Sequence, residues 1–263
     1  MNTDNISASQ GIDWIRQGFA LFRKQPAELS MLFLLYMLLM FVLSLIPLIG
    51  QLLPLLLVPT FSMAFMQACV EIEAGRKARP DLLLTAFRSP ALSTLLRLGV
   101  LYLLAAIFAV AASTIVDDGI FWKLMSGQLR ADEQNIPVAN LPLAMMFSAL
   151  IYVPFAMAFW HAAPLATWQR MGLFKSIFYS FFAVRRCGKA FLAYALGWIV
   201  VGIAIPAIIS ALLGLILGKA IVAVMLLMPL TVILTIVMYC SFYPTYLQVF
   251  ERPEENNAQV AAE

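Results

Sequence analysis

The sequence offers few residues whose type and spacing could perform chemistry. His161 is the single histidine, and no carboxylate lies at helical spacing from it. One imidazole without partners cannot hold a metal ion, so we interpret His161 as a polar residue at a helix end, with a polar functional site as the alternative. The motifs HExxH, GxSxG, GxxxxGK[ST] and GxGxxG do not occur in the sequence. We therefore expect no catalytic residue, no cofactor and no metal, and a protein that is not an enzyme.

The three cysteines, Cys69, Cys187 and Cys240, are far apart and show no CxxC or Cys/His spacing. Cys187 stands between Arg185-Arg186 and Lys189, and neighbouring cations can lower the pKa of a thiol. A plain structural role is the favoured interpretation for all three, with a reactive Cys187 as the alternative.

Composition predicts the class of protein. Hydrophobic residues make up 63% of the 263 residues and charged residues 12%, and the mean hydropathy is +0.91. A soluble domain carries roughly a quarter charged residues, and a chain of this size could not hide so much apolar surface from water. The apolar runs are continuous over about 20 residues, the length that a helix needs to cross hydrocarbon. We expect an all-α, polytopic membrane helix bundle.

Six segments are expected to cross the bilayer within a single membrane domain, residues 1–252, followed by a polar tail at 253–263. Pro47, Gly50 and Pro54 leave a re-entrant hairpin over residues 29–70 as an alternative to two full spans. The expected spans are 29–46, 52–70, 92–116, 141–163, 190–215 and 221–243.

Basic residues predict the orientation. One side of the bilayer is expected to hold the residues before the first span, between the second and third, between the fourth and fifth and after the sixth. With Arg97 at the start of the third span, this side has 14 of the 17 Lys and Arg residues. The other side has only Lys123, Arg130 and Lys219. Cytoplasmic loops carry the excess of positive charge. We therefore expect both termini to be cytoplasmic and the loop at about 117–140 to lie on the outer side, in a bacterial inner membrane.

Each pair of spans follows a similar amphipathic stretch that ends in a basic turn with Pro or Gly: residues 18–26, 84–90 and 181–188. The second helix of each pair contains a proline, at Pro59, Pro154 and Pro229. This pattern predicts three parallel hairpin repeats, each preceded by a cytoplasmic amphipathic helix. Chance similarity between apolar segments is the alternative.

These amphipathic helices are expected to lie in the headgroup plane, or to pack against the cytoplasmic face of the bundle, or both. Their cations favour anionic lipid as a partner, because each nearby Lys or Arg contributes about 1 kcal/mol of attraction to that leaflet. The candidate lipid contacts are Arg23, Lys24, Arg88, Arg185, Arg186 and Lys189.

Small residues at intervals of four, Ser210, Gly214 and Gly218, allow helix backbones to approach closely. Internal packing and self-association are both open for this stripe. The basic residues are scattered over three turns without a nucleic-acid motif, so no nucleic-acid partner is expected.

The stretch from Ala163-Pro164 through Met171-Gly172-Leu173-Phe174 to Ser176 and Ser180 resembles a superfamily of six-span bacterial inner-membrane proteins. This superfamily includes the YciC-like proteins and the membrane portion of some glycerophosphodiester phosphodiesterases. The opening, from Trp14 to Arg23, is similar to that of a proteobacterial subgroup of the same kind. The resemblance implies the six-span architecture but transfers no catalytic residue, and this chain lacks an attached phosphodiesterase domain.

Function is the least determined property. Ionisable residues are almost missing from the span cores, which lowers the expectation of ion-coupled transport or a proton relay. The leading hypothesis is a non-enzymatic protein of envelope or lipid homeostasis that binds lipid or a protein partner. The alternative is a carrier or channel for an uncharged or amphipathic solute, which requires a cavity between the repeats.

Overall fold

The computed structural model of the protein describes residues 6–47, 50, 52–129, 140–217 and 220–250, and these residues form helices and turns but no strand. The predicted all-α class is confirmed. In chain order the helices are α1 (Ala8–Lys24), α2 (Pro26–Ser44), α3 (Leu53–Glu73), the 3-10 helix η1 (Pro80–Leu84), α4 (Leu92–Ala112), α5 (Thr114–Asp117), α6 (Ile120–Met125), α7 (Leu141–Phe159), α8 (Ala162–Thr167), α9 (Leu173–Arg186), α10 (Gly188–Ile199), the π-helix η3 (Val200–Ala204), α11 (Ile205–Leu217) and α12 (Ala220–Val249).

Within the described residues, six helical segments are long and apolar enough to cross a membrane. Each expected span overlaps one of them. The helices α2 and α3 have 19 and 21 residues, so each is long enough to cross the hydrocarbon, and two full spans over residues 29–70 stay a prediction. The six segments are Pro26–Ser44, Leu53–Glu73, Leu92–Asp117, Leu141–Thr167, Gly188–Leu213 and Leu227–Val249.

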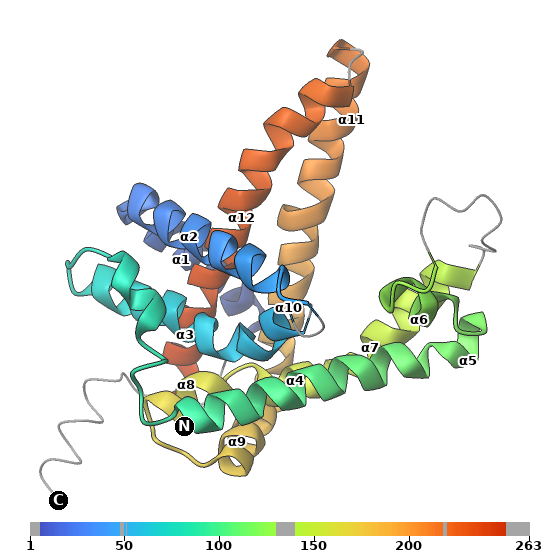
Figure 1. The fold of residues 1–263 in the computed structure, drawn as a ribbon. Coiled ribbons are helices and arrows are strands. Elements are labelled where there is room, and N and C mark those ends of the chain that lie inside the picture. The colour runs from blue at the N-terminus through green and yellow to red at the C-terminus, as the bar shows by residue number, and fades with distance from the viewer. Residues whose placement is uncertain (1–5, 48–49, 51, 130–139, 218–219, 251–263) are drawn as a thin grey trace, which may run out of the picture.

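The six segments form three hairpins: α2 with α3, α4 with α7, and the continuous α10–α11 with α12. Figure 1 shows the second and third hairpins leaving a common region in different directions, the α4–α7 pair to the right of the view and the α11–α12 pair to the top. The outer halves carry exposed apolar side chains such as Phe41, Phe108, Leu150 and Leu212. In hydrocarbon such side chains cost nothing, so these halves need only their own hairpin partner.

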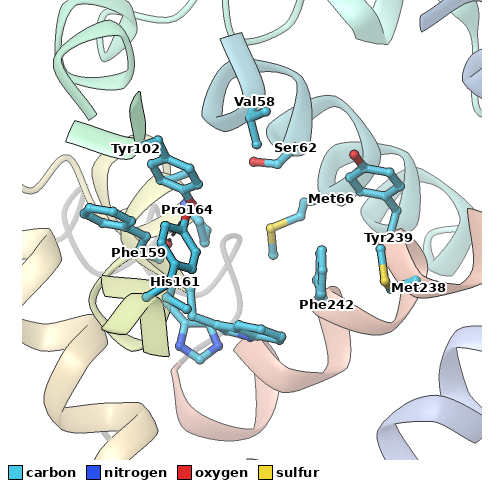
Figure 2. Close-up of a pocket in the computed structure, with 14 residues that line it drawn as sticks. Val58, Ser62, Met66, Tyr102, Phe159, His161, Pro164, Met238, Tyr239 and Phe242 are labelled. Atoms are coloured by element: carbon cyan, nitrogen blue, oxygen red, sulfur yellow. Dashed lines mark hydrogen bonds between the residues drawn. The ribbon is translucent and has the colours of Figure 1, made fainter. Parts of the chain in front are cut away.

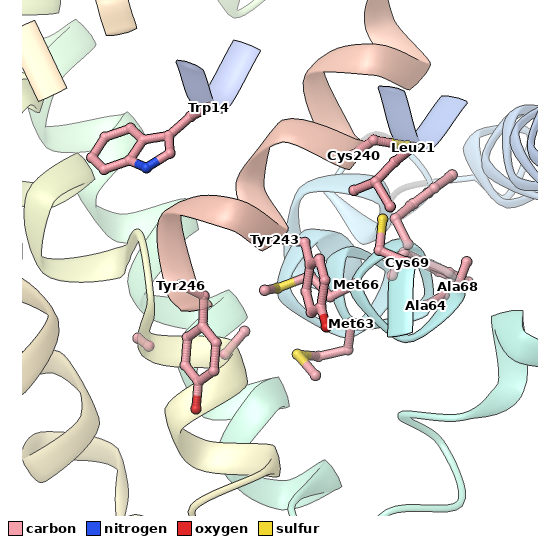
Figure 3. Close-up of a cluster of buried hydrophobic side chains, with 14 of the residues drawn as sticks. Trp14, Leu21, Met63, Ala64, Met66, Ala68, Cys69, Cys240, Tyr243 and Tyr246 are labelled. Carbon is pink, nitrogen blue, oxygen red and sulfur yellow. The ribbon is translucent and has the colours of Figure 1, made fainter. Parts of the chain in front are cut away.

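The packed core lies where the hairpins meet, which we call the junction. There the first helix of each hairpin begins and the second ends. Buried side chains come from both sets, for example Leu32 of α2, Phe65 of α3, Leu95 of α4 and Tyr246 of α12. Figure 3 shows side chains of α1, α3 and α12 converging in this core.

Helix α1 lies inside the junction. Trp14 is fully buried, its ring lies 5.0 Å from that of Phe191, and its indole N–H donates to Gln248 of α12. A Cβ atom at Gly11 or Gly18 would collide with backbone atoms of α10 or α12. Of the two arrangements expected for the first amphipathic stretch, packing against the bundle is therefore the one that the structure shows for α1.

The expectation of an amphipathic helix before each hairpin is wrong for the second hairpin. Residues 80–84 form a 3-10 helix of five residues, and turns follow up to Leu92. Pro80 and Pro90 bracket this segment, and a proline disfavours helical backbone in the residue before it, so too few residues remain for a stable α-helix.

Helix α9 precedes the third hairpin and buries its small residues. Ser176, Ser180 and Ala183 are buried against α7 and α8, whereas Phe174, Phe178 and Phe182 are exposed, Phe174 to 82%. The aromatic side of α9 thus faces away from the protein.

The second helix of each hairpin contains its proline: Pro59 lies inside α3, Pro154 inside α7 and Pro229 inside α12. The three-fold repeat itself stays a prediction. Small residues in the second hairpin serve internal packing: Ala105 and Ala109 of α4 and Ala144 and Ser148 of α7 are buried where these helices pack together.

Candidate functional site

A cavity of about 290 Å³ opens beside the junction, where the hairpins diverge; we call it the hairpin cavity. Its wall comes from all three hairpins and from α8. Figure 2 shows Tyr102, Phe159, Pro164 and His161 on one side and Tyr239 and Phe242 of α12 on the other. The lining residues are Val58, Ser62, Met66, Tyr102, Tyr152, Ala156, Phe159, Trp160, His161, Ala163, Pro164, Met238, Tyr239 and Phe242. The volume is near the lower end for ligand sites.

The described residues that line this cavity carry no formal charge, and aromatic rings dominate them. On one side Tyr102 stacks on Phe159, with ring centroids 4.5 Å apart and planes 18° from parallel. On the other side Tyr239 stacks on Phe65 at the same centroid distance. The chemistry of the wall is therefore that of neutral aromatic faces with hydroxyl groups between them.

The hydroxyl groups of the cavity wall differ in whether they already form hydrogen bonds within the protein. Ser62 donates to the carbonyl of Pro59 (2.9 Å) and Tyr102 donates to that of Phe159 (3.3 Å). The hydroxyl of Tyr152 lies close enough to Tyr102 to interact electrostatically and forms no hydrogen bond with another described residue. Its donor and acceptor capacity therefore remains open to a ligand.

The cavity residues Tyr102, Tyr152 and Tyr239 all lie near the middle of their spans. Tyrosine is ordinarily enriched at the two membrane interfaces, where its hydroxyl meets water. Tyr102 and Tyr152 are also central in the spans expected from the sequence, 92–116 and 141–163, so these two tyrosines were a usable signal for this site that the sequence interpretation missed. Tyr239 lies four residues from the end of the expected span 221–243 and gave no such signal.

His161 is placed at the break between α7 and α8 and is only 1% exposed. Its Nε2 lies 3.2 Å from Thr245 Oγ1 of α12, and its backbone N–H donates to Ser180 Oγ of α9 (2.9 Å). His161 lies at a helix end, as expected, but the bend at residues 160–161 turns its side chain into the junction rather than towards headgroups. His161 instead connects the second hairpin to α9 and α12.

The hydrogen bonds of Thr245 determine the tautomer of His161. The Thr245 hydroxyl donates to the carbonyl of Phe242 (2.7 Å) and accepts from the indole N–H of Trp160 (3.2 Å). Since its single proton is used, it can only accept from His161, so Nε2 carries the hydrogen. The Nδ1 atom is then a buried acceptor without a partner among the described residues.

The structure describes no group of three or more His, Cys, Asp and Glu side chains that could hold a metal ion. His161 has aromatic neighbours, with the rings of Phe250, Phe191 and Tyr246 within 6.1 Å. Such surroundings suit a neutral imidazole that organises packing rather than a ligand of a cation.

The six candidate lipid contacts are all exposed, and they lie at the junction end of the hairpins. Arg23 and Lys24 end α1, Arg88 precedes α4, and the other three surround the start of α10. The described ion pairs involve Arg16, Arg76 and Arg79 instead. The structure thus gathers these six cations on one end of the molecule.

Cys187 is buried at the start of α10. Burial raises the pKa of its thiol, and the opposing influence of Arg186 is smaller. Burial therefore favours the plain structural role of Cys187 over a thiol activated by neighbouring cations.

Comparison with known proteins places the chain in a family. A protein of Burkholderia thailandensis named "Probable inner membrane protein" is 36% identical over 256 residues, which cover 95% of this chain and 94% of the relative. The chain belongs to this inner-membrane protein family. No protein-family profile and no solved structure matches the chain, so the resemblance to the YciC-like proteins stays a prediction. The six long apolar helices agree with an inner-membrane protein.

Proposed function

We propose that the protein binds an uncharged amphipathic lipid in the hairpin cavity and serves envelope or lipid homeostasis without chemistry of its own. The observation that carries this proposal is the composition of the cavity wall, which combines neutral aromatic faces and hydroxyl groups from all three hairpins at membrane depth. Lipids with a small neutral head and an apolar chain offer the complementary surface.

The absence of charged side chains among the described lining residues selects the ligand. A charged head placed in this wall would lose its hydration without gaining a counter-ion, and such burial costs at least a few kcal/mol. A neutral head needs only hydrogen bonds, and the Tyr152 hydroxyl can supply one.

Access is lateral rather than from water. The hairpins diverge away from the junction (Figure 1), and the cavity lies where they begin to separate. A lipid can therefore enter from the surrounding hydrocarbon without carrying its tail through an aqueous phase.

Filling the cavity tests this proposal. Ala156→Phe adds a phenyl ring to the α7 wall of the cavity, so we expect the fraction of purified protein that carries a neutral lipid in native mass spectrometry to fall about tenfold, equivalent to roughly 1.4 kcal/mol of affinity. The matched control is Ala207→Phe, because Ala207 is exposed on α11. Wild-type protein free of neutral lipid, or equal lipid occupancy in the two variants, would refute the proposal.

A carrier for an uncharged or amphipathic solute is the second candidate, and the position of the cavity between the hairpins favours it. Proteoliposomes separate the two functions. A lipid-binding protein without transport leaves the rate at which a neutral amphiphile exchanges between leaflets as it is in protein-free vesicles, whereas a carrier accelerates that exchange, measured by back-extraction.

Anionic lipid at the junction is a further part of the proposal, supported by the six exposed cations and the exposed aromatic side of α9. Changing Arg185, Arg186 and Lys189 together to Gln is expected to lower retention of phosphatidylglycerol several-fold during purification, since each cation contributes about 1 kcal/mol. Unchanged phosphatidylglycerol content would count against it. Cytoplasmic termini are proposed with it, and reporter tags at both ends test that orientation.

A further inference from the structure

A second cavity lies farther along α12, within the third hairpin; we call it the π-turn groove. It measures about 380 Å³. Its residues come from α10, η3 and α12 and, unlike the hairpin cavity, from no other hairpin. They are Ala195, Trp198, Ile199, Gly202, Ile203, Thr231, Leu234, Thr235 and Met238.

The groove has a local cause in the sequence. Pro206 has no backbone N–H, and its ring would clash with the carbonyl of Gly202 in a regular α-helix. The chain widens into the π-helix Val200–Ala204 directly before it. Gly202 then leaves open space, because a Cβ atom there would meet only Trp198, at an ordinary 3.6 Å.

The two cavities meet at one residue. Met238 lines both the hairpin cavity and the π-turn groove, and Figure 2 shows it beside Tyr239 at the α12 side of the hairpin cavity. Methionine has three rotatable bonds and adapts to what it contacts. A change of its rotamer can therefore join the two spaces.

The two spaces differ in what they offer a ligand. The hairpin cavity presents stacked aromatic pairs on opposite sides and the hydroxyl of Tyr152. In the groove the hydroxyls of Thr231 and Thr235 are already donated to the carbonyls of Met228 and Thr231 in their own helix. Apart from the buried indole N–H of Trp198, which has no hydrogen-bond partner among the described residues, the groove offers hydrocarbon, a surface that suits a chain better than a polar head.

We propose that the ligand is a long-chain amphiphile with a flat, oxygen-bearing ring, such as a benzoquinone, whose ring lies in the hairpin cavity and whose tail passes Met238 into the π-turn groove. Aromatic walls favour a flat ring, because offset stacking and edge contacts stabilise it beyond burial alone. The groove follows α12 from Met238 to Thr231, away from the junction, so the tail remains within the hydrocarbon. This inference rests on the proposed function and adds the shape of the ligand to it.

The test compares two benzoquinones with the same dimethoxy-methyl ring, one with a methyl group and one with a decyl chain in place of the tail. Binding to the protein in lipid nanodiscs is followed by quenching of the fluorescence of Trp160 and Trp198, which line the two cavities. In the wild type we expect the decyl compound to bind at least tenfold more tightly than the tailless one. Gly202→Leu fills the groove, so it is expected to remove this tail-dependent gain while the tailless ring binds as before. Met238→Trp narrows the passage and is also expected to remove the gain, together with part of the ring binding, because Met238 lines both spaces.

The matched control is Ala207→Leu, which introduces the same leucine side chain at an exposed site on α11. It corrects for partition of the decyl compound into lipid and is expected to keep the wild-type gain. A gain that survives in both Gly202→Leu and Met238→Trp would overturn the assignment of the groove to the tail.

The ring is tested by competition with 1-O-decylglycerol, which has the same tail and a neutral head without a ring. The ring is supported if half of the bound decyl quinone is displaced only when the concentration of 1-O-decylglycerol exceeds that of the quinone more than tenfold. Displacement at an equal concentration would refute the ring but leave the proposed binding of a neutral amphiphile in place. If neither compound binds, the inference and the proposed function both fail.

Discussion

Replacing Gly99 with leucine is expected to prevent the first and second hairpins from packing. A Cβ atom at Gly99 in α4 would lie 1.8 Å from the backbone carbonyl oxygen of Leu56 in α3. Backbone cannot yield as a side-chain tip can, so the helices must separate. Overpacking costs about 1–3 kcal/mol where side chains can adjust, and more is expected here. We measure the fraction of protein that remains monodisperse in detergent after heating to a series of temperatures. The midpoint temperature of its loss should fall by more than 10 °C.

The control is Gly188→Leu, the same change at a helical glycine with no atom within 4 Å of an added Cβ. We expect the Gly188 variant to match the wild type within a few degrees. Comparable thermal midpoints for the two variants would show that α3 and α4 are not in close contact in the membrane.

Trp14→Ala is expected to detach α1 from the junction. The Trp14 side chain is fully buried between α10 and α12, and its removal also leaves Gln248 without its donor. Large-to-small changes at buried tryptophan cost about 3–5 kcal/mol. Trypsin should then cleave after Arg16 and Arg23 at least tenfold faster than in the wild type, because a detached α1 unfolds locally and exposes its backbone.

Trp122→Ala provides the comparison, since Trp122 in α6 is only partly buried and lies outside the junction core. Its proteolysis at Arg16 and Arg23 should be unchanged. If Trp14→Ala is cleaved no faster than Trp122→Ala, the burial of α1 is not what holds the amino-terminal segment.

Most helices of this fold could be predicted because the bilayer restricts the backbone. Hydrocarbon offers no hydrogen-bond partner to an exposed peptide group, so a continuous apolar run must be helical. The run that starts at Leu92 and the run that starts at Leu141 begin their helices at those residues. The expected last span, 221–243, lies inside α12, which continues to Val249. The proposed stripe Ser210, Gly214 and Gly218 stays a prediction, since Gly218 lies outside the described residues.

The site was less predictable, for a physical reason that His161 illustrates. A solitary histidine near a helix end reads as a residue in contact with headgroups, but the bend between α7 and α8 turns it towards Thr245, 84 positions along the chain. Spacing along the chain reports which residues share a face of one helix. It does not report which helix covers that face.

The sequence by itself determined the number and length of the apolar helices, the inner-membrane class and the gathering of cations next to the hairpin starts, because each follows from local hydropathy and charge. Only the tertiary structure decided that α1 is buried and that Tyr102, Tyr152 and Tyr239 surround one cavity. Those outcomes depend on how closely glycines such as Gly18 and Gly99 let backbones approach, and between apolar helices in lipid that contact is decided by shape rather than by hydrophobicity.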